Sequence, residues 1–232
     1  MITTRKSSHR GHFDLGWLDT RHTFSFGHYV DRQHMGFRSL RVINEDLIAP
    51  GNGFGQHPHD NMEIISYMAA GRLAHKDTLG TVQTISPGEV QFMSAGTGLE
   101  HSEFNPSQTE PAHLLQIWIK PAARNAKPAY GQKKFPIHDE RDRLHLVVSP
   151  DGKDGSLKIG QDARLYAGVL SKGISAHIDL APDRHAWVQV VKGSVKVAGE
   201  TLAAGDGASI SKESAIDLAA IEDCEVLIFD LD

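Results

Sequence analysis

Residues 64–96 have the sequence IISYMAAGRLAHKDTLGTVQTISPGEVQFMSAG, in which short apolar runs alternate with turn residues. The order is a strand, a glycine turn at Gly71, a second strand, and a Pro-Gly corner that leads into another strand. Residues 188–211, VQVVKGSVKVAGETLAAGDGASIS, follow the same order, with the first turn at Gly193. Both glycines are expected to adopt a positive φ, which glycine does without steric strain. The repeat predicts that the chain is built from two related β units.

The remainder of the chain has the same pattern, because apolar residues recur with a period of two and turn residues follow at intervals typical of sandwiches and barrels. We therefore predict an all-β chain with two tandem β-barrels, one in residues 1–125 and one in residues 136–232. A polar, Pro-containing stretch at about residues 121–136 is the expected linker. Residues 213–221, ESAIDLAAI, are expected to form a turn or two of helix.

The composition is that of a globular protein, since 40% of the 232 residues are hydrophobic and 23% are charged. No apolar run approaches the roughly 18–20 residues that a membrane-spanning helix needs, and the N-terminal sequence lacks the apolar core of a secretory signal. The formal net charge is −5 with scattered lysines and arginines, which argues against direct nucleic-acid binding. A single cysteine, Cys224, excludes an internal disulfide framework and a cysteine-rich zinc site. We expect a cytoplasmic monomer that does not enter membranes.

The sequence contains 14 histidines, so their spacing has to distinguish those that bind a metal. His57 and His59 are separated by one residue within GNGFGQHPHDNME, residues 51–63. On a β-strand, side chains with this spacing leave the same face, so the two imidazoles could share one metal ion. Glu63 has the same parity if the strand continues without a bulge. This motif alone predicts a pair of nitrogen ligands and a nearby carboxylate.

A second pair of ligand-type residues follows in SAGTGLEHSEFN, residues 94–105. His101 and Glu103 repeat the alternation, and the glycines before them allow a tight turn into the strand. Two strands that each offer a pair of inward side chains can surround one cation with three nitrogens and one carboxylate oxygen. Parity does not decide whether Glu63 or Glu103 supplies that oxygen.

The motifs G-x5-H-x-H-x3-E in residues 51–63 and G-x2-H-x3-N in residues 98–105 are similar to the two signature motifs of the cupin barrel. The chain further resembles the pirin family of bicupins, and the resemblance spans nearly the whole sequence. It rests on four blocks, which are RGHFDLGWLDTRHTFSF (10–26), MGFRSLRVINED (35–46), GFGQHPHDNMEI (53–64) and MSAGTGLEHSEFN (93–105). The resemblance implies two jelly-roll cupin barrels, of which only the N-terminal one binds a metal.

The resemblance also implies the ligand set, which falls on His57, His59, His101 and Glu103, and leaves Glu63 as a neighbouring group. The implied metal is Fe(II), and the same donors suit Zn, Mn, Co, Ni or Cu. Four protein ligands on a six-coordinate ion leave two positions for solvent, substrate or O2, whereas a closed four-coordinate site would favour a structural zinc. The second half has no H-x-H motif, so its histidines are expected to be surface or core residues.

Pirins similar to this chain include quercetin 2,3-dioxygenases, so the resemblance implies an oxidoreductase of flavonoid metabolism that opens a flavonol ring with O2 and releases carbon monoxide. Glu103 or Glu63 would accept the proton of the flavonol hydroxyl that binds the metal. The alternative function implied by the family is a metal-dependent regulator that binds a protein partner and turns nothing over. A third hypothesis is a dioxygenase acting on another enediol or phenol.

Overall fold

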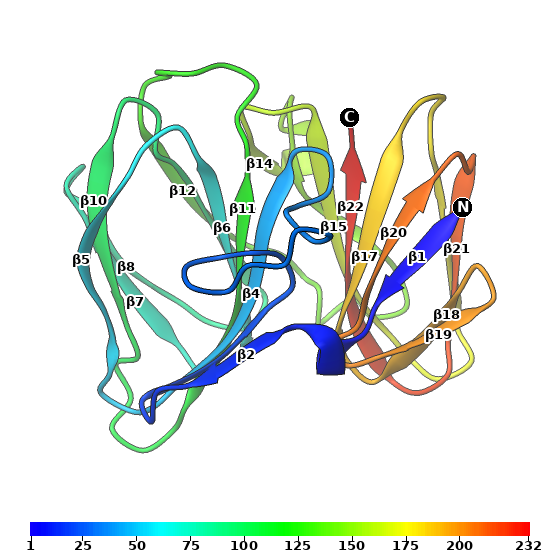
Figure 1. Cartoon of the computed structure of the whole chain (residues 1–232), viewed down its shortest axis with the longest axis horizontal. Coiled ribbons are helices and arrows are strands. Elements are labelled where there is room, and N and C mark those ends of the chain that lie inside the picture. The colour runs from blue at the N-terminus through cyan, green and yellow to red at the C-terminus, as the bar shows by residue number, and fades with distance from the viewer.

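The computed structural model describes residues 1–232, and almost all of its regular structure is β-strand. Two 3₁₀ turns, Ser7–His9 and Lys153–Gly155, are the only helical elements. The strands form four sheets, which pair into two barrels that lie side by side (Figure 1). The prediction of an all-β chain is thereby confirmed. No helix in the structure has both the length and the apolar character that crossing a membrane requires.

The N-terminal barrel consists of a seven-stranded sheet and a four-stranded sheet. In spatial order the larger sheet contains β12 (Ala129–Lys134), β9 (Glu89–Ser94), β6 (Glu63–Ala70), β11 (Ala112–Ile119), β4 (Leu40–Ile48), β3 (Leu18–His22) and β2 (Gly11–Asp14). The smaller sheet contains β5 (Gly53–His59), β10 (Leu99–Phe104), β7 (Leu73–Asp77) and β8 (Val82–Ile85).

The C-terminal barrel repeats this division into seven and four strands. Its larger sheet contains β1 (Ile2–Arg5), β20 (Gly207–Ser211), β17 (His185–Lys192), β22 (Cys224–Leu231), β15 (Ala163–Leu170), β13 (His145–Ser149) and β14 (Leu157–Lys158). Its smaller sheet contains β16 (Ser175–Asp179), β21 (Ala215–Ala220), β18 (Ser194–Val197) and β19 (Glu200–Ala203).

The two barrels have matching strand orders, because β5-β10-β7-β8 corresponds to β16-β21-β18-β19. The equivalent turns also match, with φ of 73° at Gly71 and 70° at Gly193. A Cβ added at Gly71 would lie 2.5 Å from the carbonyl oxygen of Pro111, and one at Gly193 would lie 2.0 Å from that of Asp223. Both turns therefore require glycine, and the predicted internal repeat is confirmed.

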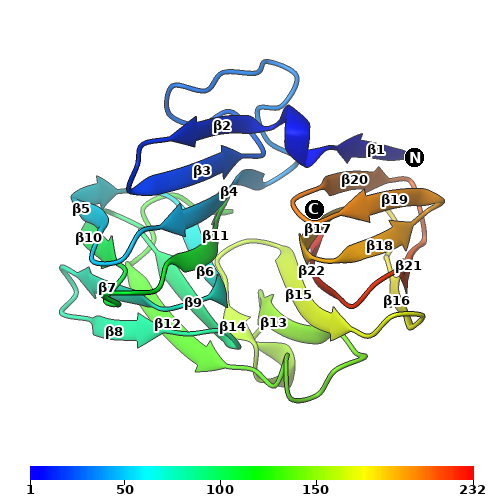
Figure 2. The same ribbon diagram turned by 90° about the horizontal axis from the view of Figure 1, so that it is seen from below.

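The boundary between the barrels differs from the expected division into residues 1–125 and 136–232. Strand β1 pairs with β20, so residues 2–5 belong to the C-terminal barrel (Figure 2). Strand β12 lies inside the expected linker but pairs with β9 of the N-terminal barrel. Both pairings join residues far apart in the sequence, and a local pattern of apolar residues carries no information about such partners.

The expected helix in residues 213–221 is wrong, because this segment contains strand β21. Ile216, Leu218 and Ala220 are buried while the residues between them are more exposed. This period of two is that of a strand with one face against a core, and tertiary packing overrides the helix propensity of the segment.

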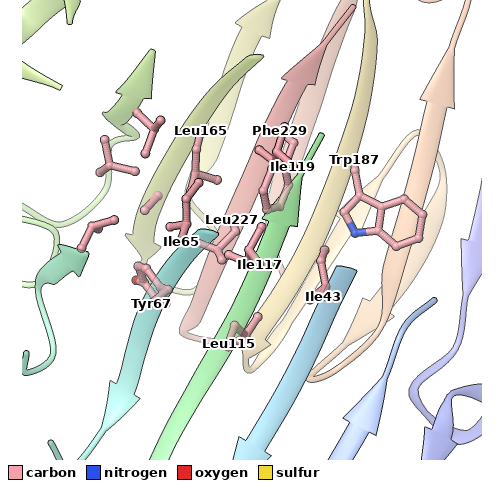
Figure 3. Packing of buried hydrophobic residues seen from close by; sticks show 14 of the residues in the cluster. Ile43, Ile65, Tyr67, Leu115, Ile117, Ile119, Leu165, Trp187, Leu227 and Phe229 are labelled. Carbon is pink, nitrogen blue, oxygen red and sulfur yellow. The ribbon is translucent and has the colours of Figure 1, made fainter. Parts of the chain in front are cut away.

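The largest apolar cluster lies between the two barrels rather than inside either one (Figure 3). It contains 25 buried residues, contributed mainly by the two seven-stranded sheets; among them are Ile65, Tyr67, Leu115, Ile117, Leu165, Leu227 and Phe229. The Tyr67 hydroxyl also donates a hydrogen bond of 2.6 Å to Oε1 of Glu225 across this interface. Burial of this much apolar surface joins the barrels into one unit.

The interiors of the two barrels differ in polarity. The C-terminal interior holds one apolar cluster of 17 buried residues, including the free thiol Cys224. The N-terminal interior holds two small apolar clusters, of seven and four residues. On β6, Ser66 lies between Met68 of one cluster and Ile64 of the other. The buried polar side chains of this barrel include Asn44, Asp46, Ser66, His75, Asp77, Gln91, His101, Glu103 and Gln116.

Candidate metal centre

Strands β5 and β10 bring three histidines together at one end of the polar interior. The strands are antiparallel, with His57 opposite His101 and His59 opposite Leu99. The imidazole centroids are 4.7 Å apart for His57 and His59, 4.5 Å for His57 and His101, and 4.8 Å for His59 and His101. One nitrogen from each ring lies within 4.8 Å of the others. The three imidazoles can therefore share one cation, as the alternation of the two motifs predicts.

The hydrogen bonds and protonation states of these rings suit metal binding. His57 donates from Nδ1 to the carbonyl oxygen of Gly55 over 2.7 Å, which leaves its Nε2 lone pair free. Nε2 of His101 is buried and has no hydrogen-bond partner, an unfavourable state that a bound metal ion would relieve. Burial, with the charge of His57, lowers the pKa of His59 to about 4 and that of His101 to about 3. Both are neutral near pH 7, the form that binds divalent transition metals.

Glu103 lies beside His101, but a β-bulge separates the two along β10. The pairing with β5 shifts from His57 opposite His101 to Phe54 opposite Glu103. A Glu103 oxygen lies within 4.8 Å of nitrogens of His101 and His75, so Glu103 groups with these two rather than with His57 and His59.

The Glu103 carboxylate is buried and held by neighbouring polar groups. Its Oε2 accepts a hydrogen bond of 2.8 Å from Nε2 of Gln116, and Oγ of Ser66 lies 3.4 Å from Oε1. Burial, followed by the nearby charge of Asp46, raises its pKa to about 7. A cation beside His101 would favour the ionised carboxylate, so this position suits a fourth ligand.

Glu63 does not face the histidines, which corrects the expectation that it is a neighbouring catalytic group. Its Oε1 accepts a hydrogen bond of 2.8 Å from Oγ of Ser94, and its Oε2 accepts one of 3.1 Å from the backbone N–H of Gly160 in the other barrel. Strand β5 ends at His59, and Asn61, with φ of 46°, turns the chain before β6 begins at Glu63. This turn breaks the strand parity on which the expectation rested.

A cavity of about 360 Å³ opens beside the candidate ligands. His57, His59 and Glu103 form part of its lining, so a molecule in the cavity would contact the metal position directly. Most of the surface exposed inside the cavity is apolar, and the Phe and Trp residues of its lining are Phe13, Phe26, Phe54 and Trp118. Aromatic side chains bind planar rings by stacked and edge-to-face contacts. The cavity is therefore suited to a planar aromatic molecule.

Strands β3 and β4 add polar side chains to this lining, among them His22, Asn44 and Asp46. Nδ1 of His22 and Oδ1 of Asn44 are buried and have no hydrogen-bond partner. Burial lowers the pKa of His22 to about 4 and raises that of Asp46 to about 6. Because unpaired buried polar atoms are unfavourable, these groups are available to bind hydroxyl groups of a ligand.

His75 and Asp77, which were not predicted as site residues, lie on β7 next to β10 and have completely buried side chains. Nε2 of His75 lies 2.9 Å from Oδ2 of Asp77, and Nδ1 of His75 lies 3.4 Å from Nδ1 of His101. The spacing of one residue between His75 and Asp77 is the same signal that singles out His57 and His59. It could have been found between the two cupin motifs.

The histidines of the C-terminal half lie at the surface or, like His145, in the core, as expected. His177 is exposed, with its ring nitrogens 2.7 Å from Asp217 and 3.0 Å from Asp179. His185 contacts Oγ of Ser211 over 2.8 Å. Neither belongs to a group of residues that could hold a metal ion.

The chain is similar to known proteins over nearly its whole length. The family model of pirin matches residues 3–119, and that of the quercetinase C-terminal cupin domain matches residues 146–231. A quercetin 2,3-dioxygenase of Escherichia coli (strain K12) is 48% identical over 231 residues, which cover 100% of this chain and 99% of that protein.

Two crystal structures from Escherichia coli have nearly the same fold. YhhW is 48% identical and superimposes with a TM-score of 0.96, covering 100% of this chain and 98% of that chain. The bacterial pirin YhhW in complex with nickel(II) is also 48% identical, with a TM-score of 0.95 and coverage of 100% and 99%. The predicted pair of cupin barrels is confirmed, and the chain belongs to the pirin family.

Proposed function

We propose that this protein is a metal-dependent dioxygenase of the quercetin 2,3-dioxygenase type, which opens a flavonol ring with O2 and releases carbon monoxide. The observation that carries the proposal is the cavity of about 360 Å³, which brings an aromatic-lined space into contact with His57, His59 and Glu103. Ligand-binding cavities of this kind are concave, mostly apolar and have few polar groups. The name of the relative from Escherichia coli that is 48% identical supports the same reaction.

We further propose His57, His59, His101 and Glu103 as the ligands of one divalent metal. The three imidazoles lie together, and Glu103 is on the side of His101 next to His75. The donor set suits Fe(II), which the family implies, as well as the nickel(II) held by YhhW. A bound divalent metal supplies Lewis acidity, which lowers the pKa of a coordinated hydroxyl group.

The protein side chains would bind and orient the flavonol. Trp118, Phe13 and Phe26 would contact its rings and exclude water, while Asn44 and His22 would bind hydroxyl groups at the polar part of the lining. Glu103, the one carboxylate of the proposed ligand set, would accept the proton of the 3-hydroxyl group. Ring opening adds both atoms of O2 to the flavonol and expels one ring carbon with its oxygen as carbon monoxide, which leaves a depside.

The cavity favours a dioxygenase over the regulator that the family also implies. A metal ion that only sets the shape of a binding surface does not need an open space beside its ligands. A catalytic metal does, because substrate must reach it. We therefore retain the dioxygenase as the proposed function.

The test is a turnover assay on the whole chain. The apo-protein is loaded anaerobically with Fe(II), or with Mn, Co, Ni, Cu or Zn, and mixed with quercetin and O2. We expect loss of the visible absorbance of quercetin with release of one carbon monoxide per molecule consumed. A flavone without the 3-hydroxyl group is the matched control and should not react.

The outcomes separate the proposals. Metal uptake without quercetin turnover for any of these metals would contradict the dioxygenase and leave the ligand set intact. Turnover of the flavone at the same rate would contradict the role of the 3-hydroxyl group. Turnover of another phenol or enediol in place of quercetin would support the same site with a different substrate.

A further inference from the structure

Strand β7 lies against the side of β10 that faces away from β5. In the register of this pairing, Asp77 is opposite His101 and His75 is opposite Glu103. The side chains of His75 and Asp77 have no exposed surface. They therefore form a buried layer directly behind two of the proposed metal ligands.

Asp77 is fixed as a hydrogen-bond acceptor. Its Oδ1 accepts hydrogen bonds of 2.9 Å from the backbone N–H groups of Leu79 and Thr81 in the turn between β7 and β8. Its Oδ2 faces Nε2 of His75 at 2.9 Å. A carboxylate in this position can only accept, so the neutral His75 ring carries its proton on Nε2.

This assignment determines the proton positions on the next ring. With its proton on Nε2, His75 has a lone pair on Nδ1, which faces Nδ1 of His101 at 3.4 Å and Nε2 of Gln91 at 3.4 Å. The Gln91 amide nitrogen can only donate, which independently makes Nδ1 of His75 an acceptor. His101 therefore carries its proton on Nδ1, and its buried, unpartnered Nε2 has a free lone pair.

We propose that Asp77 and His75 are positioning residues that fix the tautomer of His101. The Asp77 carboxylate accepts the Nε2 proton of His75, and Nδ1 of His75 accepts the Nδ1 proton of His101. The Nε2 lone pair of His101 then faces the metal position. The inference rests on the proposed role of His101 as a ligand. Partners behind metal-binding histidines fix the tautomer and orientation of the ring. Here the carboxylate acts through an intervening histidine rather than directly.

The substitution Asp77→Asn tests this chain of hydrogen bonds. The amide oxygen would keep accepting from Leu79 and Thr81, which turns the amide N–H groups toward Nε2 of His75. His75 would then carry its proton on Nδ1 and His101 on Nε2, the tautomer that cannot bind a metal through Nε2. We expect the affinity of the whole apo-protein for Ni²⁺, measured by titration calorimetry, to fall by about 10–100-fold.

The matched control is Asp206→Asn in the C-terminal barrel. Asp206 is also buried and accepts hydrogen bonds from the backbone N–H groups of Ser7 and Ala203, but it contacts no histidine. This variant should bind Ni²⁺ like the unmodified protein. Equal Ni²⁺ affinity in Asp77→Asn and the unmodified protein, with His101→Ala losing Ni²⁺, would overturn the inference and leave the metal site standing.

A second measurement does not depend on metal binding or on the stability of the variant. Nitrogen chemical shifts of the imidazoles in apo-protein with ¹⁵N-labelled histidine identify the protonated nitrogen of each ring. We expect His75 to be protonated on Nε2 and His101 on Nδ1. The opposite tautomers would contradict the inference, whether or not the protein binds Ni²⁺. Failure of the unmodified protein to bind Ni²⁺ would instead contradict the proposed metal site.

Discussion

The strand pair β5–β10 of the N-terminal barrel and the pair β16–β21 of the C-terminal barrel occupy the same place in the strand order, yet their inward faces are chemically different. In the first pair, His57 lies opposite His101, and both rings belong to the candidate metal centre. In the second pair, Ile178 lies opposite Ile216, and both are part of the apolar interior. The N-terminal interior is polar and contains the candidate metal centre, whereas the C-terminal interior is filled with apolar side chains.

The C-terminal pair nevertheless carries ligand-type side chains on its outer face. His177 lies opposite Asp217 in the register, as His57 lies opposite His101. The side chains of His177 and Asp217 are 55% and 81% exposed, so solvent screens their contact. A shift of one residue in a strand exchanges its inward and outward side chains. Both barrels therefore carry a pair of ligand-type residues on this strand pair. Whether the pair belongs to the buried candidate metal centre or lies at the surface depends on which face of the strands its side chains occupy.

The largest expected effect tests this comparison directly, with His101→Ala and His177→Ala as matched substitutions. His101→Ala removes a buried nitrogen of the proposed ligand set and should abolish both stoichiometric metal uptake and quercetin turnover. His177→Ala removes an exposed imidazole and should leave both unchanged. Metal content by elemental analysis of dialysed protein is the measurement. Full metal content in His101→Ala would show that the ligand set is wrong.

The next effect compares Glu103, a carboxylate inside the N-terminal barrel, with Glu63, a carboxylate that faces the other barrel. Glu103→Gln should lower metal affinity, because it removes the charge of a proposed ligand. Loss of a hydrogen-bond partner behind a ligand costs roughly 10–100-fold in affinity, and the loss here should be at least as large. Glu63→Gln should leave metal affinity unchanged, since Glu63 contacts Ser94 and Gly160 on the other face. Calorimetric titration with Ni²⁺ compares the two variants. A larger loss in Glu63→Gln would restore that residue as the carboxylate ligand.

The smallest effect is the contribution of the Glu103 carboxyl group in the polar interior to the pH dependence of stability. Burial raises the pKa of Glu103 from 4.5 to about 7 in the folded apo-protein. The folded state therefore holds this proton more tightly than the unfolded state, so the free energy of unfolding falls as the pH rises from about 4.5 to about 7. Relative to Glu103→Gln, apo-protein should lose on the order of 3 kcal/mol over this window.

Denaturant titrations of both apo-proteins at several pH values measure this difference. If stability depends on pH in the same way in Glu103→Gln and in the unmodified apo-protein, the pKa of Glu103 is not raised in the folded state. Addition of Ni²⁺ should remove most of the difference, because a bound cation favours the ionised carboxylate.

Much of the fold could be predicted from local pattern. Alternating apolar residues indicate strands, and the required glycines at Gly71 and Gly193 mark equivalent turns of two related units. The strands β1 and β12 could not be assigned to their barrels, because their partners β20 and β9 are distant in sequence. The segment that forms β21 resembles a helix in sequence because its alternation is short, and its burial depends on the surrounding barrel.

For the candidate site, the sequence by itself determined which strands carry ligand-type pairs, because a spacing of two residues places side chains on one face of any strand. Only the tertiary structure decided which groups meet. The turn at Asn61 directs Glu63 to the other barrel, and the pairing of β7 with β10 places His75 behind His101. These contacts depend on chain direction after a turn and on pairing between distant strands, which residue spacing does not encode.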